Sequence, residues 1–245
     1  MKAKQKEKME QEERNDRNRR SAMTEKMNVL GVELSILPVQ GAMARMDKNL
    51  RKGGLYVIQY LSIDLLTHAE QDEELRNCIN QIDLKLIGEK SLLDVIGNKE
   101  RIREREVSEN EFMKAFLKRV ARERYPVFLL CDDEEKVERF TNYLNIHYRE
   151  AKIVDTYSME NWFGDYDEIV NRINGSGADV VITVLESPFR ETFVAHNRNK
   201  LSPSIWFGLG EKQIGEFLEH HKTSFLWELF RQTMFKRRVN KYKDK

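Results

Sequence analysis

Apolar and polar residues change their spacing several times along this chain of 245 residues. Residues 28–36 (NVLGVELSI) alternate apolar with polar, which predicts a strand with one buried face. After Pro38 the spacing of apolar residues becomes helical through residue 50. Proline is well tolerated in the first turn of a helix, so Pro38 is compatible with a helix that begins there. Three later runs are apolar on both faces, as strands of a covered parallel sheet are: residues 55–61 (LYVIQYL), 127–131 (VFLLC) and 178–185 (ADVVITVL).

The remaining periodic segments continue the alternation of strand and helix. Further helices are expected over residues 63–81, around 112–120, around 137–144, and over 166–174 with Gly175 as a left-handed cap. Further strands are expected over residues 82–88, 151–157 and 203–210. Strands that alternate with helices of about ten to fifteen residues indicate an α/β fold of Rossmann-like type, with a mostly parallel sheet and helices on both faces.

The composition divides the chain into three parts. Residues 1–26 are almost entirely polar and charged, which predicts a disordered or solvated tail. Residues 27–210 hold the α/β pattern without a Pro- or Ser-rich linker and are expected to form one domain. Residues 211–245 form a separate basic and aromatic appendage with a helical pattern.

Charge and cysteine usage exclude several classes of protein. Lys and Arg number 42 against 41 Asp and Glu, so the overall charge gives no reason to expect a nucleic-acid partner. The two cysteines, Cys78 and Cys131, lie in apolar surroundings, which favours buried thiols in a cytosolic protein. No apolar run approaches the roughly 18 residues of a transmembrane helix, and the N-terminus has no signal-peptide core.

Ligands of open parallel sheets bind beyond the carboxyl ends of the strands, which directs attention to four strand ends. The loop 131–136 (CDDEEK) follows one of them, but its acids cap a helix and repel phosphate. The DYDE stretch (165–168) resembles a metal-binding Asp-x-Asp, yet its place at the start of a helix favours N-capping. The five histidines show no ligand spacing, so we expect neither a zinc site nor any other metal.

The appendage combines aromatic side chains with a cluster of cations. Residues 225–245 (FLWELFRQTMFKRRVNKYKDK) suit the headgroup region of an anionic membrane. A helix that docks on the domain and keeps its charged face in water is an equal alternative. Nucleic acid is a weaker third choice, because the cations are confined to this segment.

Several stretches together resemble the WecG/TagA/CpsF glycosyltransferases over about residues 28 to 240. The likeness is strongest in VFLLCDDEEKVERFTNYLNIHY, in AKIVDTYSMENWFGDYDEIVNRINGSGADVVITVLESPFRETFV, in SIWFGLG and in LWELFRQTMFKRR. The resemblance implies transfer of an N-acetylhexosamine-type sugar from a UDP donor to a lipid-linked acceptor. It places that reaction in cell-surface polysaccharide or teichoic acid synthesis, at the cytoplasmic membrane face.

The resemblance also implies positions for the functional residues. The Gly-x-Pro-x-Gln-Glu motif of the family falls on residues 186–191, with Pro188 and Glu191 kept and with Glu186 and Arg190 substituted. The Asp-Gly of the family, which carries the proposed base, falls on Gly88–Glu89, so Glu89 is a carboxylate displaced by one position. The family's arginine before a short turn is matched by Arg105.

The resulting assignment has three groups of residues and no metal. The catalytic candidates are Glu89 and Arg105, and the donor-binding candidates are Pro188, Arg190, Glu191, Gly208 and Gly210. The candidates for membrane or acceptor contact are Trp227, Arg231, Lys236, Arg237 and Arg238. UDP-sugar is a substrate, and no cofactor is expected.

Two hypotheses follow from the resemblance. The first is a divergent glycosyltransferase whose partners are a UDP-sugar, a lipid-linked acceptor and an anionic membrane, with a second copy of the chain as a further candidate partner. The second is a pseudoenzyme of the same fold that acts as a membrane-associated partner or scaffold. Both predict a cytoplasmic protein that is peripheral at the inner face of the cell membrane.

Overall fold

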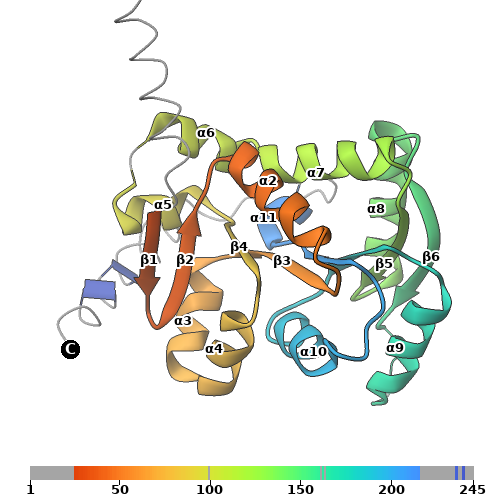
Figure 1. The fold of residues 1–245 in the computed structure, drawn as a ribbon. Coiled ribbons are helices and arrows are strands. Elements are labelled where there is room, and N and C mark those ends of the chain that lie inside the picture. Colours follow the sequence, from red (N-terminus) through yellow and green to blue (C-terminus); the bar gives the residue numbers. More distant parts are fainter. Residues whose placement is uncertain are drawn as a thin grey trace, which may run out of the picture.

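The computed structural model describes residues 25–98, 100–160, 162, 164–215, 235–236 and 239–240. Its centre is a sheet of six parallel strands in the order β4-β3-β8-β7-β5-β6 (Figure 1). The strands of this sheet are β3 (Tyr56–Leu61), β4 (Leu84–Ile87), β5 (Pro126–Cys131), β6 (Lys152–Ser158), β7 (Val180–Val184) and β8 (Ile205–Gly208). The predicted Rossmann-like α/β fold is confirmed.

Helices cover both faces of the sheet because successive side chains of each inner strand point to opposite, equally apolar sides. One core contains Val57, Phe128 and Trp206 and packs against the helices of the first face. These helices are α3 (Ile63–Gln71), α4 (Glu73–Asn80), α5 (Lys90–Ile96), α9 (Tyr166–Gly175) and α10 (Phe189–Asn197). The second core contains Ile58 and Phe207 and packs against α2 (Val39–Leu50), α7 (Glu111–Arg122), α8 (Glu134–His147) and α11 (Glu211–Ile214).

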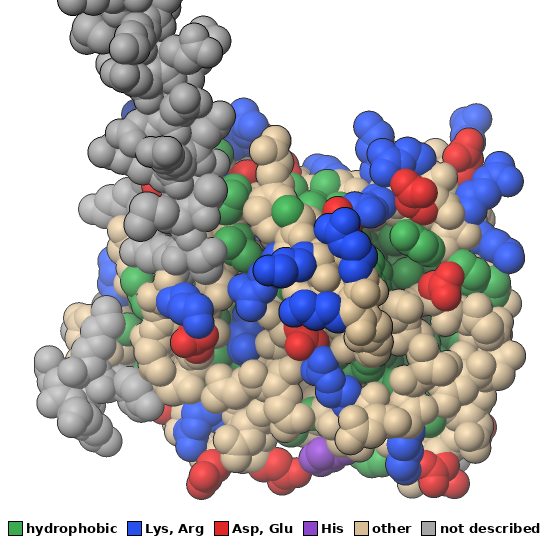
Figure 2. Space-filling model, in the orientation of Figure 1, with side chains coloured by type: hydrophobic (Ala, Val, Ile, Leu, Met, Phe, Trp, Pro, Cys, Tyr) green, Lys and Arg blue, Asp and Glu red, His purple; other side chains and the backbone are tan. Residues whose placement is uncertain are grey.

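Apart from Arg103, Arg190 and Glu191, the charged side chains of the described residues are not buried. Figure 2 shows Lys and Arg side chains spread over the centre of one face, where α2 lies in Figure 1. Arg119 of α7 donates to Asp47 of α2 at 2.7 Å, so an ion pair joins the two neighbouring helices. Their apolar sides carry Ala42, Met46 and Phe116 into the second core.

The segment predicted as one strand over residues 28–36 is instead a hairpin. Strands β1 (Glu25–Val29) and β2 (Val32–Ile36) pair antiparallel around a turn at Leu30 and Gly31, both with positive φ. Asn28 accepts a hydrogen bond from Gly31 N at 3.0 Å, which closes the turn. The prediction failed because apolar residues at every second position from Leu30 to Ile36 continue through the turn, and only Val29 is out of phase. The first strand begins at Glu25.

Two helix predictions are also corrected. The segment 63–81 contains two helices, α3 and α4, since Asp72 adopts an extended conformation between them and its side chain accepts from Leu75 N at 3.0 Å. Gly175 is the last residue of α9, and the left-handed glycine that follows is Gly177. The capping predictions are confirmed: Asp133 accepts from Lys136 N at the start of α8, and Asp165 accepts from Asp167 N at the start of α9.

Candidate active site

The topology places a crevice at the carboxyl edge of the sheet between β3 and β8. The chain leaves β3 into α3 on the first face and leaves the adjacent β8 toward α11 on the second face. Such a reversal opens a space between the two departing loops, and ligands of open α/β sheets bind there. The residues at this edge come from the ends of β3, β4, β7 and β8 and from the starts of α7 and α10.

The crevice is filled by three buried polar side chains, Gln59, Arg190 and Glu191. Gln59 and Glu191 are fully buried, and Arg190 is 6% exposed. Arg190 donates to Glu191 Oε1 through Nε at 3.0 Å and through Nη2 at 2.9 Å, while Gln59 Nε2 donates to the same oxygen. Arg190 Nη1 also donates to the Leu185 and Leu209 carbonyl oxygens. The structure therefore turns both predicted donor-binding side chains inward, where they join β3, β7, β8 and α10.

The other predicted donor-binding residues surround this network. Gly208 ends β8, and a Cβ added there would lie 3.0 Å from Gln59 Cγ and 3.2 Å from Arg190 Cδ. A Cβ on Gly210 would lie 2.7 Å from Gln213 Oε1. Pro188 follows a cis peptide bond and is the N-cap residue of α10. These glycines make room for side chains of the chain itself.

Glu89 lies where β4 leads into α5. Its Oε1 accepts a hydrogen bond from Ile63 N at 2.6 Å, so the carboxylate sits at the N-terminus of α3. Gly88, directly before it, has its N–H bonded to the Leu61 carbonyl at 2.8 Å. A Cβ on Gly88 would lie 2.6 Å from that oxygen. The backbone therefore leaves no room for an aspartate at this position, and Glu89 supplies a carboxylate one residue later.

Gln213, on the short helix α11, fixes the same loop from the other side. Its Nε2 donates to the Gly88 carbonyl at 3.1 Å and to Asn110 Oδ1 at 2.8 Å. Gln213 is 1% exposed, and Asn110, with a φ of 51°, leads into α7. One glutamine thus joins the β4 and β8 loops to the start of α7.

Arg105 does not face this site. Its side chain is 65% exposed and pairs with Glu111 at 3.1 Å. The arginine that points inward is Arg103, two residues earlier on α6 (Arg101–Ser108), which is 8% exposed. Arg103 lines a cavity of about 50 Å³ next to the ends of β3 and β4.

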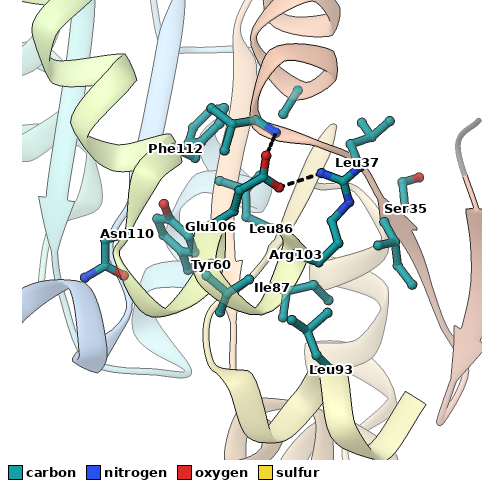
Figure 3. Close-up of a pocket in the computed structure, with 14 residues that line it drawn as sticks. Ser35, Leu37, Tyr60, Leu86, Ile87, Leu93, Arg103, Glu106, Asn110 and Phe112 are labelled. Carbon is teal, nitrogen blue, oxygen red and sulfur yellow. Dashed lines mark hydrogen bonds and ion pairs between the residues drawn. The ribbon is translucent and has the colours of Figure 1, made fainter. Parts of the chain in front are cut away.

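Most of the wall of this cavity is apolar (Figure 3). Its labelled residues come from the end of β2 and the β2–α2 connection, the ends of β3 and β4, α5, α6 and the start of α7: Ser35, Leu37, Tyr60, Leu86, Ile87, Leu93, Arg103, Glu106, Asn110 and Phe112. Arg103 Nη1 donates to Glu106 Oε2 at 2.6 Å within it. The cavity therefore adds an internally paired arginine and an apolar surface to the strand-end site.

The acidic loop after β5 is engaged in local structure. Asp132 Oδ1 accepts from Glu186 N at 3.0 Å, and Lys136 pairs with Asp132 at 2.8 Å. Burial, with these carboxylates nearby, raises the pKa of the Cys131 thiol far above its ordinary value. The loop therefore joins β5 to β7 and offers no cradle for a phosphate.

Sequence reasoning missed Gln59, Arg103 and Gln213. Gln59 had a signal, because it is the one polar residue in the apolar run LYVIQYL. Arg103 had none, since it stands in the mixed-charge stretch RIREREVS, where any arginine looks equally solvated. Gln213 had none either, since it lies at the start of the appendage, outside the basic and aromatic residues 225–245 that drew attention to this segment.

Of the appendage residues proposed for membrane or acceptor contact, Trp227, Arg231, Arg237 and Arg238 lie outside the described residues. Lys236 is exposed. The neighbouring Phe235 and Val239 are 1% and 3% exposed and belong to the first core. Within the part of the chain that the structure describes, no helix has the length and apolar character needed to cross a bilayer.

The parallel sheet and the polar groups at its carboxyl edge define a Rossmann-like α/β protein with a strand-end site. Residues 27–212 match the glycosyl transferase WecG/TagA/CpsF family, and the chain belongs to that family. The resemblance drawn from the sequence motifs is thereby confirmed. A search of curated proteins gave no significant match.

Proposed function

We propose that the chain transfers an N-acetylhexosamine-type sugar from a UDP donor to a lipid-linked acceptor at the cytoplasmic membrane face. Membership of a glycosyltransferase family supports transfer. The observation that carries the proposal is Glu89, whose carboxylate lies at the carboxyl edge, between β4 and the N-terminus of α3. Sugar transfer needs a base within hydrogen-bond reach of the acceptor hydroxyl, and a carboxylate is suited to that role.

In this reaction the oxygen of the acceptor hydroxyl bonds to the anomeric carbon, and Glu89 takes the proton of that hydroxyl. The bond from that carbon to the UDP oxygen breaks, and UDP leaves with the electron pair. Negative charge then grows on the diphosphate, where a guanidinium and backbone N–H groups stabilise it. No metal is part of this proposal.

Transfer is tested with purified full-length protein, a panel of UDP-sugars and a lipid-linked acceptor, by measuring UDP release and labelled product. Glu89→Gln keeps an oxygen for the Ile63 N–H but removes the base, so turnover is expected to fall by about 10²-fold or more. Glu109→Gln, on an exposed residue, is the matched control and should leave turnover unchanged. Equal turnover in Glu89→Gln and the control would contradict the role of Glu89.

The second candidate is a pseudoenzyme that keeps the fold and acts as a membrane-associated partner or scaffold. One observation favours it: Gln59, Arg190 and Glu191 fill the crevice where a donor would bind. It predicts no UDP affinity by calorimetry at millimolar ligand, with membrane or partner binding retained. Turnover of any UDP-sugar by the purified protein would exclude it.

A further inference from the structure

An internal carboxylate occupies an anion-binding position beside the cavity. Glu106 Oε2 accepts from Arg103 Nη1 at 2.6 Å, and Glu106 Oε1 accepts from Val39 N at 3.3 Å (Figure 3). Val39 is the first residue of the 12-residue helix α2, whose N-cap Pro38 offers no side-chain cap. A single carboxylate therefore bridges a guanidinium and a helix N-terminus.

These two partners are the groups that bind phosphate in proteins. Guanidinium makes charge-assisted hydrogen bonds to phosphate oxygens, and the first N–H groups of a helix favour an anion. Arg103 is more than nine-tenths buried and faces the cavity, whereas Arg105 on the same helix is mostly exposed. Arg103 Nε also lies 3.6 Å from Glu100 Oε2, but the Glu100 side chain is mostly exposed and contacts the guanidinium from its solvent side. The position is thus built for an anion, and Glu106 occupies it on the side of the helix N-terminus.

The surroundings indicate what such an anion would be attached to. Leu37, Leu86, Ile87, Leu93 and Phe112 form an apolar wall around the ion pair. At about 50 Å³ the cavity holds only a few atoms, so a ligand has to move Glu106 aside to enter. A phosphate ester whose neighbouring atoms are apolar, or can lie against an apolar wall, fits this combination.

We propose that Arg103 binds a phosphate group of a substrate, and that Glu106 holds this position closed until the phosphate displaces it. The inference rests on the proposed function for the presence of phosphate at this edge. Two substrates carry phosphate, the UDP donor and the lipid-linked acceptor, and their shared chemistry is a phosphate ester. Because Glu106 competes with the ligand, the observed affinity is lower than that of the open site.

Calorimetry with UDP and with dodecyl phosphate tests the proposal on the full chain, and dodecyl maltoside serves as an uncharged probe. Glu106→Gln keeps an oxygen for the Val39 N–H but removes the competing charge, so phosphate affinity should rise about threefold or more. Arg103→Leu should weaken it about tenfold or more. Arg105→Leu, on the exposed neighbour, is the control and should match the wild type. Arg103→Lys, with its thermal unfolding recorded, covers the case in which Arg103→Leu does not fold.

The two phosphate probes distinguish the donor from the acceptor as the source of the phosphate. If both changes appear with UDP alone, the phosphate belongs to the donor; with dodecyl phosphate alone, it belongs to the acceptor; with both probes, either phosphate enters. The proposal would be overturned if Glu106→Gln left the phosphate affinity unchanged and if Arg103→Leu, or Arg103→Lys in its place, bound the probes as tightly as Arg105→Leu. Calorimetry measures binding and does not require sugar transfer. If Arg103 bound phosphate in a protein that transferred no sugar, the proposed function would be refuted and this inference would stand.

Discussion

Glu191 is the residue on which the strand-end network depends. Its Oε1 receives hydrogen bonds from Arg190 and Gln59, and its side chain has no exposure to solvent. Removing one partner of a buried ion pair leaves the other charge uncompensated, which costs about 3–5 kcal/mol. Glu191→Leu should lower the free energy of unfolding by that amount, measured by urea denaturation.

The matched control for Glu191 is Glu186→Leu, since Glu186 is an exposed glutamate at the same strand end. It should change the free energy of unfolding by less than about 0.5 kcal/mol. A Glu191 variant as stable as this control would mean that the network does not hold the crevice closed.

Gly88 carries a backbone constraint that bears on catalysis. A Cβ there would approach the Leu61 carbonyl oxygen to 2.6 Å, so any larger residue must shift the backbone. Gly88→Ala should destabilise the protein by about 1–3 kcal/mol, through the strain of overpacking. Gly53→Ala is a useful contrast, because nothing lies near a Cβ there and only its positive φ opposes the change. A Gly88→Ala protein as stable as the wild type would show that the loop has room for the aspartate of the family.

At the scale of elements, β6 and α9 are joined by one ion pair. Arg172 donates to both carboxylate oxygens of Asp155, at 2.9 and 3.0 Å. The hydrogen bonds from Arg172 hold the pKa of the Asp155 carboxyl below its usual range. Because the folded pKa is lowered, the pair contributes stability above the unfolded carboxyl pKa of about 4 and loses it as pH falls through the folded value.

Asp155→Asn should therefore be less stable than the wild type by about 0.5–1 kcal/mol at pH 7, since both side chains are partly exposed. The difference should shrink below pH of about 4 and vanish in stronger acid. Urea denaturation of both proteins across this range is the measurement. A difference that is constant with pH would assign the effect to packing rather than to charge.

The elements themselves were largely readable from the sequence, and the failures share a cause. Strands apolar on both faces, such as β3, β5 and β7, were predicted because only a covered parallel sheet buries both sides. The hairpin and the break at Asp72 were missed because the apolar spacing continues across both turns. The closed crevice could not be predicted either, since Gln59 and Glu191 are 132 positions apart and only the fold brings them together.

At the scale of the whole molecule, the C-terminal segment has two sides. Phe235 and Val239, four residues apart, are buried in the core that also holds the β1–β2 hairpin, while Lys236 is exposed. This arrangement fits a segment docked on the domain through Phe235 and Val239, with Lys236 turned outward. Docking through Phe235 and Val239 leaves Lys236 exposed, so docking does not exclude the binding of an anionic membrane that we propose for the appendage.

Substitutions on the two sides should separate these roles. Phe235→Ala should lower the free energy of unfolding by about 3–5 kcal/mol, because it leaves a cavity in a packed core. Its flotation with anionic vesicles should stay unchanged at temperatures where it is folded. Lys236→Glu should leave stability unchanged and weaken vesicle binding roughly fivefold or more at low salt, since each cation near an anionic surface contributes about 1 kcal/mol. If Phe235→Ala instead lost vesicle binding while keeping its stability, the aromatic side chain would have to enter the bilayer and the docked arrangement would be refuted.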